Sequence, residues 1–153
     1  MHNEYSKWPE SSWTSETIDW KAAKAITAGV DIGTTSAQAA VFCDGELFGW
    51  ANIRIGACFK KAADEVIAKA LGASGMQLSD IGTIVATGFG QDNVSYATKK
   101  MDEVHCHMKG ARFMYGPSVH TVVDLGAQTT KAIRVYDWDR VRDFMMNDKC
   151  ATG

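Results

Sequence analysis

Two segments of the chain share a sequence that suits phosphate chemistry. Residues 30–36 read Val-Asp-Ile-Gly-Thr-Thr-Ser, and residues 123–129 read Val-Asp-Leu-Gly-Ala-Gln-Thr. The Asp-x-Gly pattern therefore occurs at Asp31 and again 93 residues later at Asp124. In both copies an apolar run precedes the aspartate, which predicts a strand that ends in a tight turn. A single turn of this kind is usually an ordinary hairpin, and the duplication is what indicates a shared ligand.

Such a turn favours phosphate oxygens. Glycine lets the backbone approach a ligand with no Cβ in the way, and successive amide groups and hydroxyls then face one concavity. A carboxylate would repel phosphate unless a divalent cation lay between them, so Asp31 and Asp124 are expected to hold Mg²⁺ through water or to orient the attacking water. The residues expected to contact phosphate are Gly33, Thr34, Thr35, Ser36, Gly126, Ala127 and Thr129.

The four cysteines are candidates for thiol or metal chemistry. Their spacing does not suggest a small disulfide scaffold, and residues 1–21 lack the apolar stretch of a signal peptide, so we expect a cytoplasmic protein with reduced thiols. Cys43 follows an apolar strand and Cys58 precedes an amphipathic helix, so both are interpreted as packing residues or unused thiols. Cys106 and Cys150 lie beside turns that contain glycine or alanine.

A zinc site built from Cys106 with His105 and His107 is an alternative, because thiolates and imidazoles are both good zinc donors. Consecutive residues of a helix or strand diverge rather than converge on one ion, and no Cys-x-x-Cys pair completes a tetrahedron. The two histidines are therefore interpreted as surface groups or as groups that support a ligand.

The repeated segments lie in two similar groups of three strands. The strands are expected at 26–32, 37–42 and 47–55 in the first group, and at 119–125, 130–135 and 141–146 in the second. Between the groups, apolar residues at helical spacing predict a helix over 59–71 that ends at Gly72. A strand at 81–87 and a helix around 106–115 follow it.

Composition limits the remaining possibilities. The chain has 153 residues, 46% of them apolar, which is enough for one substantial core. A formal net charge of −2 provides no basic surface for nucleic acid, and no apolar run approaches the roughly 20 residues that cross a bilayer. Neither nucleic acid nor a membrane is an expected partner. Residues 1–25 are polar and irregular, and we interpret them as an N-terminal extension whose tryptophans either dock on a surface or belong to a flexible tail.

The paired strand groups resemble the ASKHA superfamily of sugar kinases, Hsp70 and actin. In that fold ATP lies between two ribonuclease-H-like domains, and each domain contributes one phosphate-binding hairpin. The resemblance implies an α/β fold with a mixed sheet, in which residues 26–116 form the first ATPase domain and residues 117–153 begin the second. The family continues past the equivalent of Gly153, so we expect an incomplete second domain that presents its hairpin but does not support ATP turnover unaided.

Three further segments resemble the activator of 2-hydroxyacyl-CoA dehydratase and the ATP-binding subunits of benzoyl-CoA reductase. They are Ala-Thr-Gly-Phe-Gly at 86–90, His-Cys-His-Met-Lys-Gly-Ala at 105–111 and Met-Asn-Asp-Lys-Cys-Ala-Thr-Gly at 146–153. In that family the cysteines of the last two segments bind a 4Fe-4S cluster shared across a dimer, which implies Cys106 and Cys150 as metal ligands. A cubane cluster takes four thiolates, so two subunits would complete the set.

The resemblance implies an ATPase that couples hydrolysis to low-potential electron transfer through the cluster. The implied cofactors are ATP, Mg²⁺ and the 4Fe-4S cluster. The implied partners are a second ATPase subunit, identical or related, an acyl-CoA reductase or dehydratase, and a ferredoxin-type electron donor. The family's second phosphate motif resembles Asp-Ile-Gly-Gly-Gln-Asp, whereas this chain has Ala127 at the second glycine; Gln128 remains and is expected to orient water.

The length of the N-terminal extension favours a benzoyl-CoA reductase subunit over a dehydratase activator, because the activators carry a shorter one. Two alternatives come from other classes of function. A small-molecule kinase of the same fold would need a catalytic aspartate near a substrate pocket rather than paired cysteines. A non-catalytic relative would use the fold only to bind a nucleotide or a partner.

Overall fold

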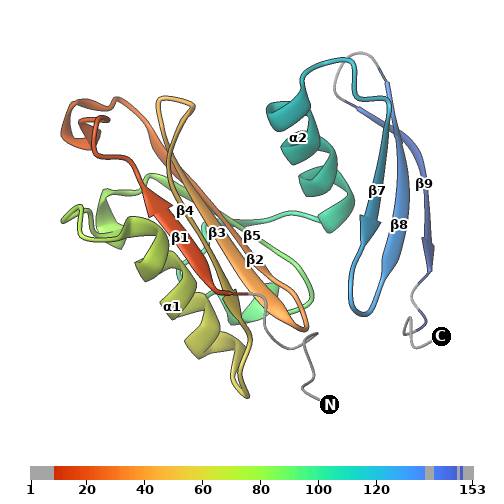
Figure 1. The fold of residues 1–153 in the computed structure, drawn as a ribbon, viewed down its shortest axis with the longest axis horizontal. Coiled ribbons are helices and arrows are strands. Elements are labelled where there is room, and N and C mark those ends of the chain that lie inside the picture. Colours follow the sequence, from red (N-terminus) through yellow and green to blue (C-terminus); the bar gives the residue numbers. More distant parts are fainter. Residues whose placement is uncertain (1–8, 137–139, 148, 150–153) are drawn as a thin grey trace. The chain divides into compact units, whose positions relative to one another are not determined.

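The structure is a computed structural model that describes residues 9–136, 140–147 and 149. The chain forms two compact units, Met1–Lys100 and Met101–Gly153. Figure 1 shows a sheet with helix α1 in the first unit, and helix α2 with a second sheet in the other. Within the described residues, no helix is long and apolar enough to cross a membrane.

The first unit contains a mixed sheet of six strands among the residues described, in the order β1-β4-β3-β2-β5-β6. Strands β2, β3 and β4 are antiparallel neighbours, whereas β5 is parallel to β2. Short 3₁₀ turns at Trp20–Ala22, Leu78–Asp80 and Gln91–Asn93 connect these strands. The strands are β1 Ser11–Thr14, β2 Ile26–Ile32, β3 Ser36–Cys43, β4 Glu46–Arg54, β5 Thr83–Thr87 and β6 Lys99–Lys100.

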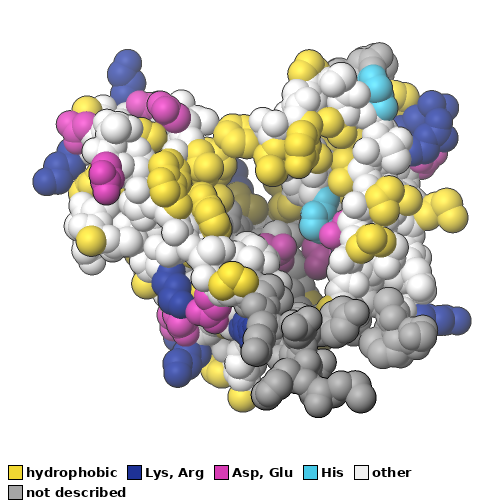
Figure 2. Space-filling view, viewed as in Figure 1, with side chains coloured by type: hydrophobic (Ala, Val, Ile, Leu, Met, Phe, Trp, Pro, Cys, Tyr) yellow, Lys and Arg dark blue, Asp and Glu magenta, His cyan; other side chains and the backbone are white. Residues whose placement is uncertain are grey.

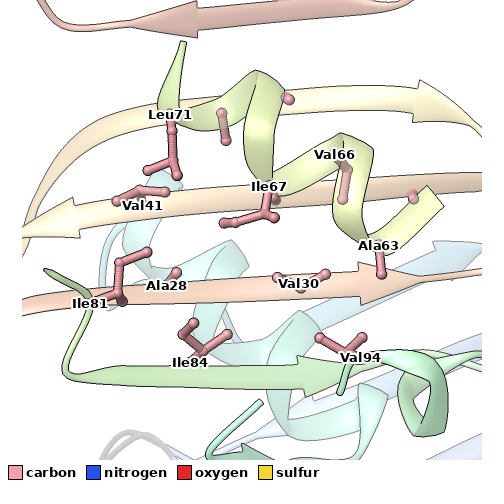
Figure 3. Close-up of a cluster of buried hydrophobic side chains, with 14 of the residues drawn as sticks. Ala28, Val30, Val41, Ala63, Val66, Ile67, Leu71, Ile81, Ile84 and Val94 are labelled. Carbon is pink, nitrogen blue, oxygen red and sulfur yellow. The ribbon is translucent and has the colours of Figure 1, made fainter. Parts of the chain in front are cut away.

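Helix α1 (Phe59–Leu71) covers one face of this sheet (Figure 1). Its buried residues recur at helical spacing, and Gly72, with a φ of 57°, ends the helix by donating its amide to the Ala68 carbonyl oxygen at 3.1 Å. Figure 3 shows Val66 and Ile67 packed among side chains of the underlying strands. Full burial of each such side chain is worth about 1.5–3 kcal/mol, so this interface holds the sheet in shape.

The second unit consists of α2 (Glu103–Tyr115) on a sheet of β7 (Thr121–Leu125), β8 (Thr130–Val135) and β9 (Val141–Asn147). All neighbouring strands are antiparallel, and Val104 and Met108 of the helix pack on Ile133 and Val135. The buried Arg112 guanidinium donates to the carbonyl oxygens of Val119 and Tyr136, so it ties the helix to the chain around the sheet.

The opposite face of this sheet carries exposed apolar side chains. Val123, Ala132 and Met145 are register partners on the three strands, and Val123 and Met145 are 61% and 79% exposed. Leu125, two residues beyond Val123 on the same face, is 78% exposed. In Figure 2, hydrophobic side chains also gather over α2, whose last residues, Phe113–Tyr115, are exposed. Apolar groups therefore line parts of the surface of this unit.

Each helix and strand expected from the sequence is present, and these elements follow one another in the expected order. The strands at 26–32 and 130–135 and the helix at 59–71 have the bounds predicted for them. Helix α2 begins three residues earlier than expected, because the carboxylate of Asp102 caps it by accepting the His105 amide at 3.0 Å. The compact units divide at 100/101, because α2 packs on β7, β8 and β9, and the boundary between the two ATPase domains at 116/117 stays a prediction.

Part of the expected N-terminal extension is built into the first unit. Residues 11–14 form the edge strand β1, which pairs with β4 so that Trp13 lies opposite Trp50. Trp20 packs against the core, and its indole nitrogen donates to the Ser74 carbonyl oxygen at 3.2 Å. Residues 11–14 are therefore regular where an irregular segment was expected, and Trp20 agrees with the docking interpretation, while Trp8 lies outside the described residues.

Candidate functional site

The first candidate hairpin joins β2 to β3. The Gly33 amide donates to the Ser36 carbonyl oxygen at 3.0 Å, and a Cβ at Gly33 would lie 3.0 Å from the same oxygen. Thr34 and Thr35 are exposed at the tip, and Asp31, next to the last residue of β2, is half-buried. The turn is therefore tight at the glycine and presents its hydroxyls to solvent.

The second hairpin, between β7 and β8, repeats this geometry. The Gly126 amide donates to the Thr129 carbonyl oxygen at 2.9 Å, and a Cβ at Gly126 would lie 2.8 Å from that oxygen. Ala127 and Gln128 are exposed at the tip, and Asp124 is half-buried next to the end of β7. The sequence repeat is therefore also a structural repeat, with the same closing hydrogen bond in both copies.

Asp31 lies in a polar row across the sheet, on the face opposite α1. Its register partners are Gln38 on β3 and Thr87 on β5. The amide of Gln38 donates to the Ser36 hydroxyl at 2.8 Å and to the Asn52 side-chain oxygen at 2.9 Å. Gln38 therefore orients one of the candidate phosphate ligands, a role that sequence reasoning did not assign.

Gly88 and Thr87 complete the surroundings of Asp31. Gly88 has a φ of +87°, and a Cβ there would lie 2.6 Å from the Ile32 carbonyl oxygen and closer still to a carboxylate oxygen of Asp31. The Thr87 hydroxyl is buried and has no hydrogen-bond partner among the described residues. An unpaired buried hydroxyl beside a carboxylate suits a bound water or a hydrated cation. Residues 86–90 served only as a resemblance motif, and their contact with Asp31 required the parallel pairing of β2 and β5.

Asp124 has charged neighbours that sequence reasoning also missed. The ammonium group of Lys131 lies 3.1 Å from Asp124 Oδ2, 2.7 Å from Glu103 Oε2 and 2.8 Å from Thr129 Oγ1. Burial alone would lower the pKa of Lys131, but the hydrogen bonds to Glu103 and Asp124 outweigh it and raise the pKa above its ordinary value. The one signal in the sequence is that Lys131 shares the buried face of β8 with Ile133 and Val135.

The two histidines beside Cys106 have separate acidic partners. His105 Nδ1 lies 2.9 Å from Asp102, and His107 Nε2 lies 3.4 Å from Asp124 Oδ2. Burial favours a higher pKa for Asp102, but the hydrogen bonds from the amide and ring of His105 outweigh it and lower the pKa. No group of three or more His, Cys, Asp or Glu side chains is arranged to hold a metal ion in the part of the chain that the structure describes. His105 and His107 thus contact different carboxylates, Asp102 and Asp124.

The candidate cluster ligands can be placed only in part. Cys106 is half-buried in α2, near Glu103 and His107, whereas Cys150 lies outside the described residues. The last residue of β9, Asn147, pairs with Thr130 at the end of the sheet where the hairpin lies, and the first turns of α2 lie at that end too. Cys43 is buried, which raises its pKa, and Cys58 is exposed before α1.

A mixed sheet with this duplicated hairpin defines an ATPase of the actin-like fold, which confirms the expected fold class. The chain belongs to the BadF/BadG/BcrA/BcrD ATPase family, whose model matches residues 28–153. The resemblance to dehydratase activators and benzoyl-CoA reductase subunits is therefore confirmed at the level of the family.

Relatives of both kinds are similar to the chain. It is 38% identical over 127 residues to the activator of lactoyl-CoA dehydratase from Anaerotignum propionicum, covering 83% of this chain and 49% of that protein. A benzoyl-CoA reductase subunit from Thauera aromatica is 31% identical over 134 residues, covering 84% of this chain and 46% of that subunit.

A solved structure supports the same family. The activator of 2-hydroxyisocaproyl-CoA dehydratase from Clostridium difficile, with bound ADPNP, superposes with a TM-score of 0.75 at 33% identity, covering 82% of this chain and 47% of that one. The chain spans about half the length of the curated relatives it matches.

Proposed function

We propose that this chain binds the phosphates of Mg²⁺-ATP as part of an ATP-driven activator that delivers low-potential electrons to an acyl-CoA enzyme. The observation that carries the proposal is the duplicated hairpin, closed by the same hydrogen bond in both copies, in a member of an ATPase family. The backbone amides of the two turns and the hydroxyls of Thr34, Thr35, Ser36 and Thr129 are the proposed phosphate contacts.

The proposed role of Asp31 and Asp124 is to accept hydrogen bonds from water bound to Mg²⁺, or to ligate the ion. Both carboxylates lie beside a hairpin, and Asp31 has as a neighbour the Thr87 hydroxyl, which is unpaired among the described residues. Gln128 is exposed at the tip of the second hairpin, where its side-chain amide is available to orient a water molecule. Ala127 is exposed too, so its methyl group is not buried among the described residues.

Cys106 and Cys150 are the proposed ligands of a 4Fe-4S cluster shared with a second subunit. Such a cluster supplies one-electron transfer at a potential set by charge, hydrogen bonding and exposure. The support from this chain is that the helix turn bearing Cys106 and the end of β9 lie at the same end of their sheet. A ferredoxin-type donor is the proposed source of the electron.

The electron acceptor that we propose is a 2-hydroxyacyl-CoA dehydratase, with benzoyl-CoA reductase as the second candidate. Three relatives that are 33–38% identical, above the 31% of the benzoyl-CoA reductase subunit, are named dehydratase activators. The length of the N-terminal segment was the reason to favour a reductase. Part of this segment forms the edge strand β1 of the sheet, so its length does not indicate a reductase.

Iron and sulfide analysis of the natural full-length protein, prepared without oxygen, tests the proposal. We expect about four irons per dimer, lost in Cys106→Ser and in Cys150→Ser but kept in the control variants Cys43→Ser and Cys58→Ser. Reduction of the cluster and ATP hydrolysis should both be measurable, and Asp31→Asn and Asp124→Asn should lower hydrolysis only. Cluster loss confined to the control variants would disprove the ligand assignment, and phosphoryl transfer to a small molecule would favour the kinase.

A further inference from the structure

Lys131 is a buried charge whose hydrogen-bonding capacity is fully used. An ammonium group has three donors, and here the three acceptors are Glu103 Oε2, Asp124 Oδ2 and Thr129 Oγ1. The side chain is 3% exposed. Displacing any one acceptor leaves a buried donor unpaired, which is costly, so the position of the ammonium depends on all three partners.

These partners belong to two different parts of the unit. Asp124 and Thr129 flank the second hairpin, whereas Glu103 is the first residue of α2. His107, one helical turn after Glu103 and on the same helix face, lies 3.4 Å from Asp124 Oδ2. The helix segment that contains Cys106 therefore contacts the Asp124–Lys131 pair through two side chains.

The first hairpin provides an internal comparison. Gln38 occupies the position of Lys131 in the repeat, and it makes the same hydrogen bond, to the Ser36 hydroxyl at 2.8 Å, that Lys131 makes to Thr129. The second hydrogen bond of the Gln38 amide stays within the sheet, at Asn52. Only in the second copy does this position carry a charge that reaches a helix. Supporting the hairpin hydroxyl is therefore common to both copies, and the link to α2 is an addition.

We infer that Lys131 is a positioning residue that couples ligand occupancy at Asp124 to the first turns of α2. The inference rests on the proposed function, in which Asp124 turns to a hydrated Mg²⁺ ion. Lys131 and His107 both contact Oδ2 of Asp124, so they lose that acceptor when Asp124 turns to a cation. Lys131 then keeps two of its three acceptors, Glu103 and Thr129. Residues 103–107 shift together with the Glu103 carboxylate. The coupling is reciprocal, so changes at Glu103 also alter nucleotide affinity.

Hydrogen exchange of residues 103–110 tests the inference in the natural full-length protein, with and without Mg²⁺ and the non-hydrolysable analogue ADPNP. In the wild type we expect the analogue to change the exchange rate of this segment by about fivefold or more, the lower end of the range for coupled sites. In Glu103→Gln and Lys131→Met, with the analogue at saturating concentration, the change should fall below about twofold, and nucleotide affinity should change by no more than the coupling factor that is lost. Asp64→Ala, on the exposed face of α1 and outside both hairpins, is the control and should keep the response.

The outcomes separate the coupling from the proposed function. A response that persists in both variants, or wild-type protein that binds the nucleotide without any change in α2, overturns the coupling and leaves nucleotide binding in place. Wild-type protein that does not bind the nucleotide overturns the proposed function and the coupling with it. Lys131→Met leaves two carboxylates without their cation; should it fail to fold, Glu103→Gln decides, because it keeps the Lys131–Asp124 pair.

Discussion

Gly88 lies so close to Asp31 that a side chain at position 88 would collide with the Asp31 carboxylate. The parallel pairing of β2 with β5 brings the end of one strand against the turn that follows the other. A side chain at position 88 would displace the carboxylate of Asp31 and press on the backbone of Ile32. The positive φ adds a second reason for glycine, since other residues rarely adopt it.

Gly88→Ala is therefore expected to lower the free energy of unfolding by about 2 kcal/mol or more, from backbone strain together with the contact to Ile32. Nucleotide binding should weaken as well, because Asp31 has to move. Gly110→Ala in α2 is the control: space is open around it, and alanine in a helix interior should stabilise by about 0.5–1 kcal/mol. Urea unfolding measures both, and an unchanged stability in Gly88→Ala would contradict the close approach.

The variant Thr87→Val tests whether the Thr87 hydroxyl contributes to function or to stability. The Thr87 hydroxyl has no partner among the described residues, so its replacement should leave stability unchanged or raise it by up to about 1 kcal/mol. ATP hydrolysis should fall by about tenfold, equivalent to about 1.4 kcal/mol, if the hydroxyl holds water beside Asp31. Thr98→Val is the matched control, because the Thr98 hydroxyl exchanges two hydrogen bonds with Ile84 and its loss should destabilise without a specific effect on hydrolysis. Wild-type hydrolysis in Thr87→Val would remove this residue from the site.

At the scale of elements, the start of α2 depends on a single side chain. Asp102 caps the helix that carries Cys106, and its hydrogen bonds with His105 lower its pKa. A carboxyl group whose pKa is lower in the folded state stabilises the fold above its unfolded pKa, and this contribution disappears as the pH falls through the folded value.

Asp102→Ala is expected to lower the free energy of unfolding by about 1 kcal/mol near neutral pH, the usual cost of losing a helix cap. The difference from the wild type should shrink below about pH 4, where the aspartate becomes protonated. Thermal unfolding of both proteins across this range measures it. Asp64→Ala, on the exposed face of α1, is the control, and a difference that stays constant down to low pH would contradict the role of the carboxylate.

The elements also show how far the sequence could predict this molecule. Alternating apolar residues predicted β2 and β8, and helical spacing predicted α1, because burial on one face sets these periods. Strand β1 has the sequence Ser-Ser-Trp-Thr, and three of its four residues are exposed. It therefore lacks the alternating apolar pattern that would have predicted a strand paired with β4. The candidate hairpins were predictable from the repeat alone. The approach of Gly88 to Asp31 and of Glu103 to Lys131 joins segments far apart in the chain, and only the tertiary structure brings them together.

At the scale of the whole molecule, the two units have cores of unequal size. The buried cluster of the first unit includes residues of four strands and α1, whereas that of the second is built around Val104, Met108, Ile133 and Val135. Local stability follows the amount of buried apolar contact. The unit that carries the Lys131 contacts is therefore the one expected to open more readily, which suits a part that responds to a ligand.

We expect the amides of β2 and β3 to exchange with solvent at least about tenfold more slowly than those of β7 and β8, a difference of about 1.4 kcal/mol in opening free energy. Hydrogen exchange measured by mass spectrometry resolves these segments. Ile67→Ala should remove about 2–5 kcal/mol of this protection in the first unit while leaving the exchange of β7 and β8 nearly unchanged. Equal exchange rates in the two sheets would contradict the difference in core size.

The bare face of the β7-β8-β9 sheet has a practical consequence for handling the protein. Val123, Leu125 and Met145 present contiguous hydrocarbon to water, a pattern that monomeric proteins keep small. We therefore expect the protein to enhance the fluorescence of hydrophobic dyes and to scatter more light as it is concentrated.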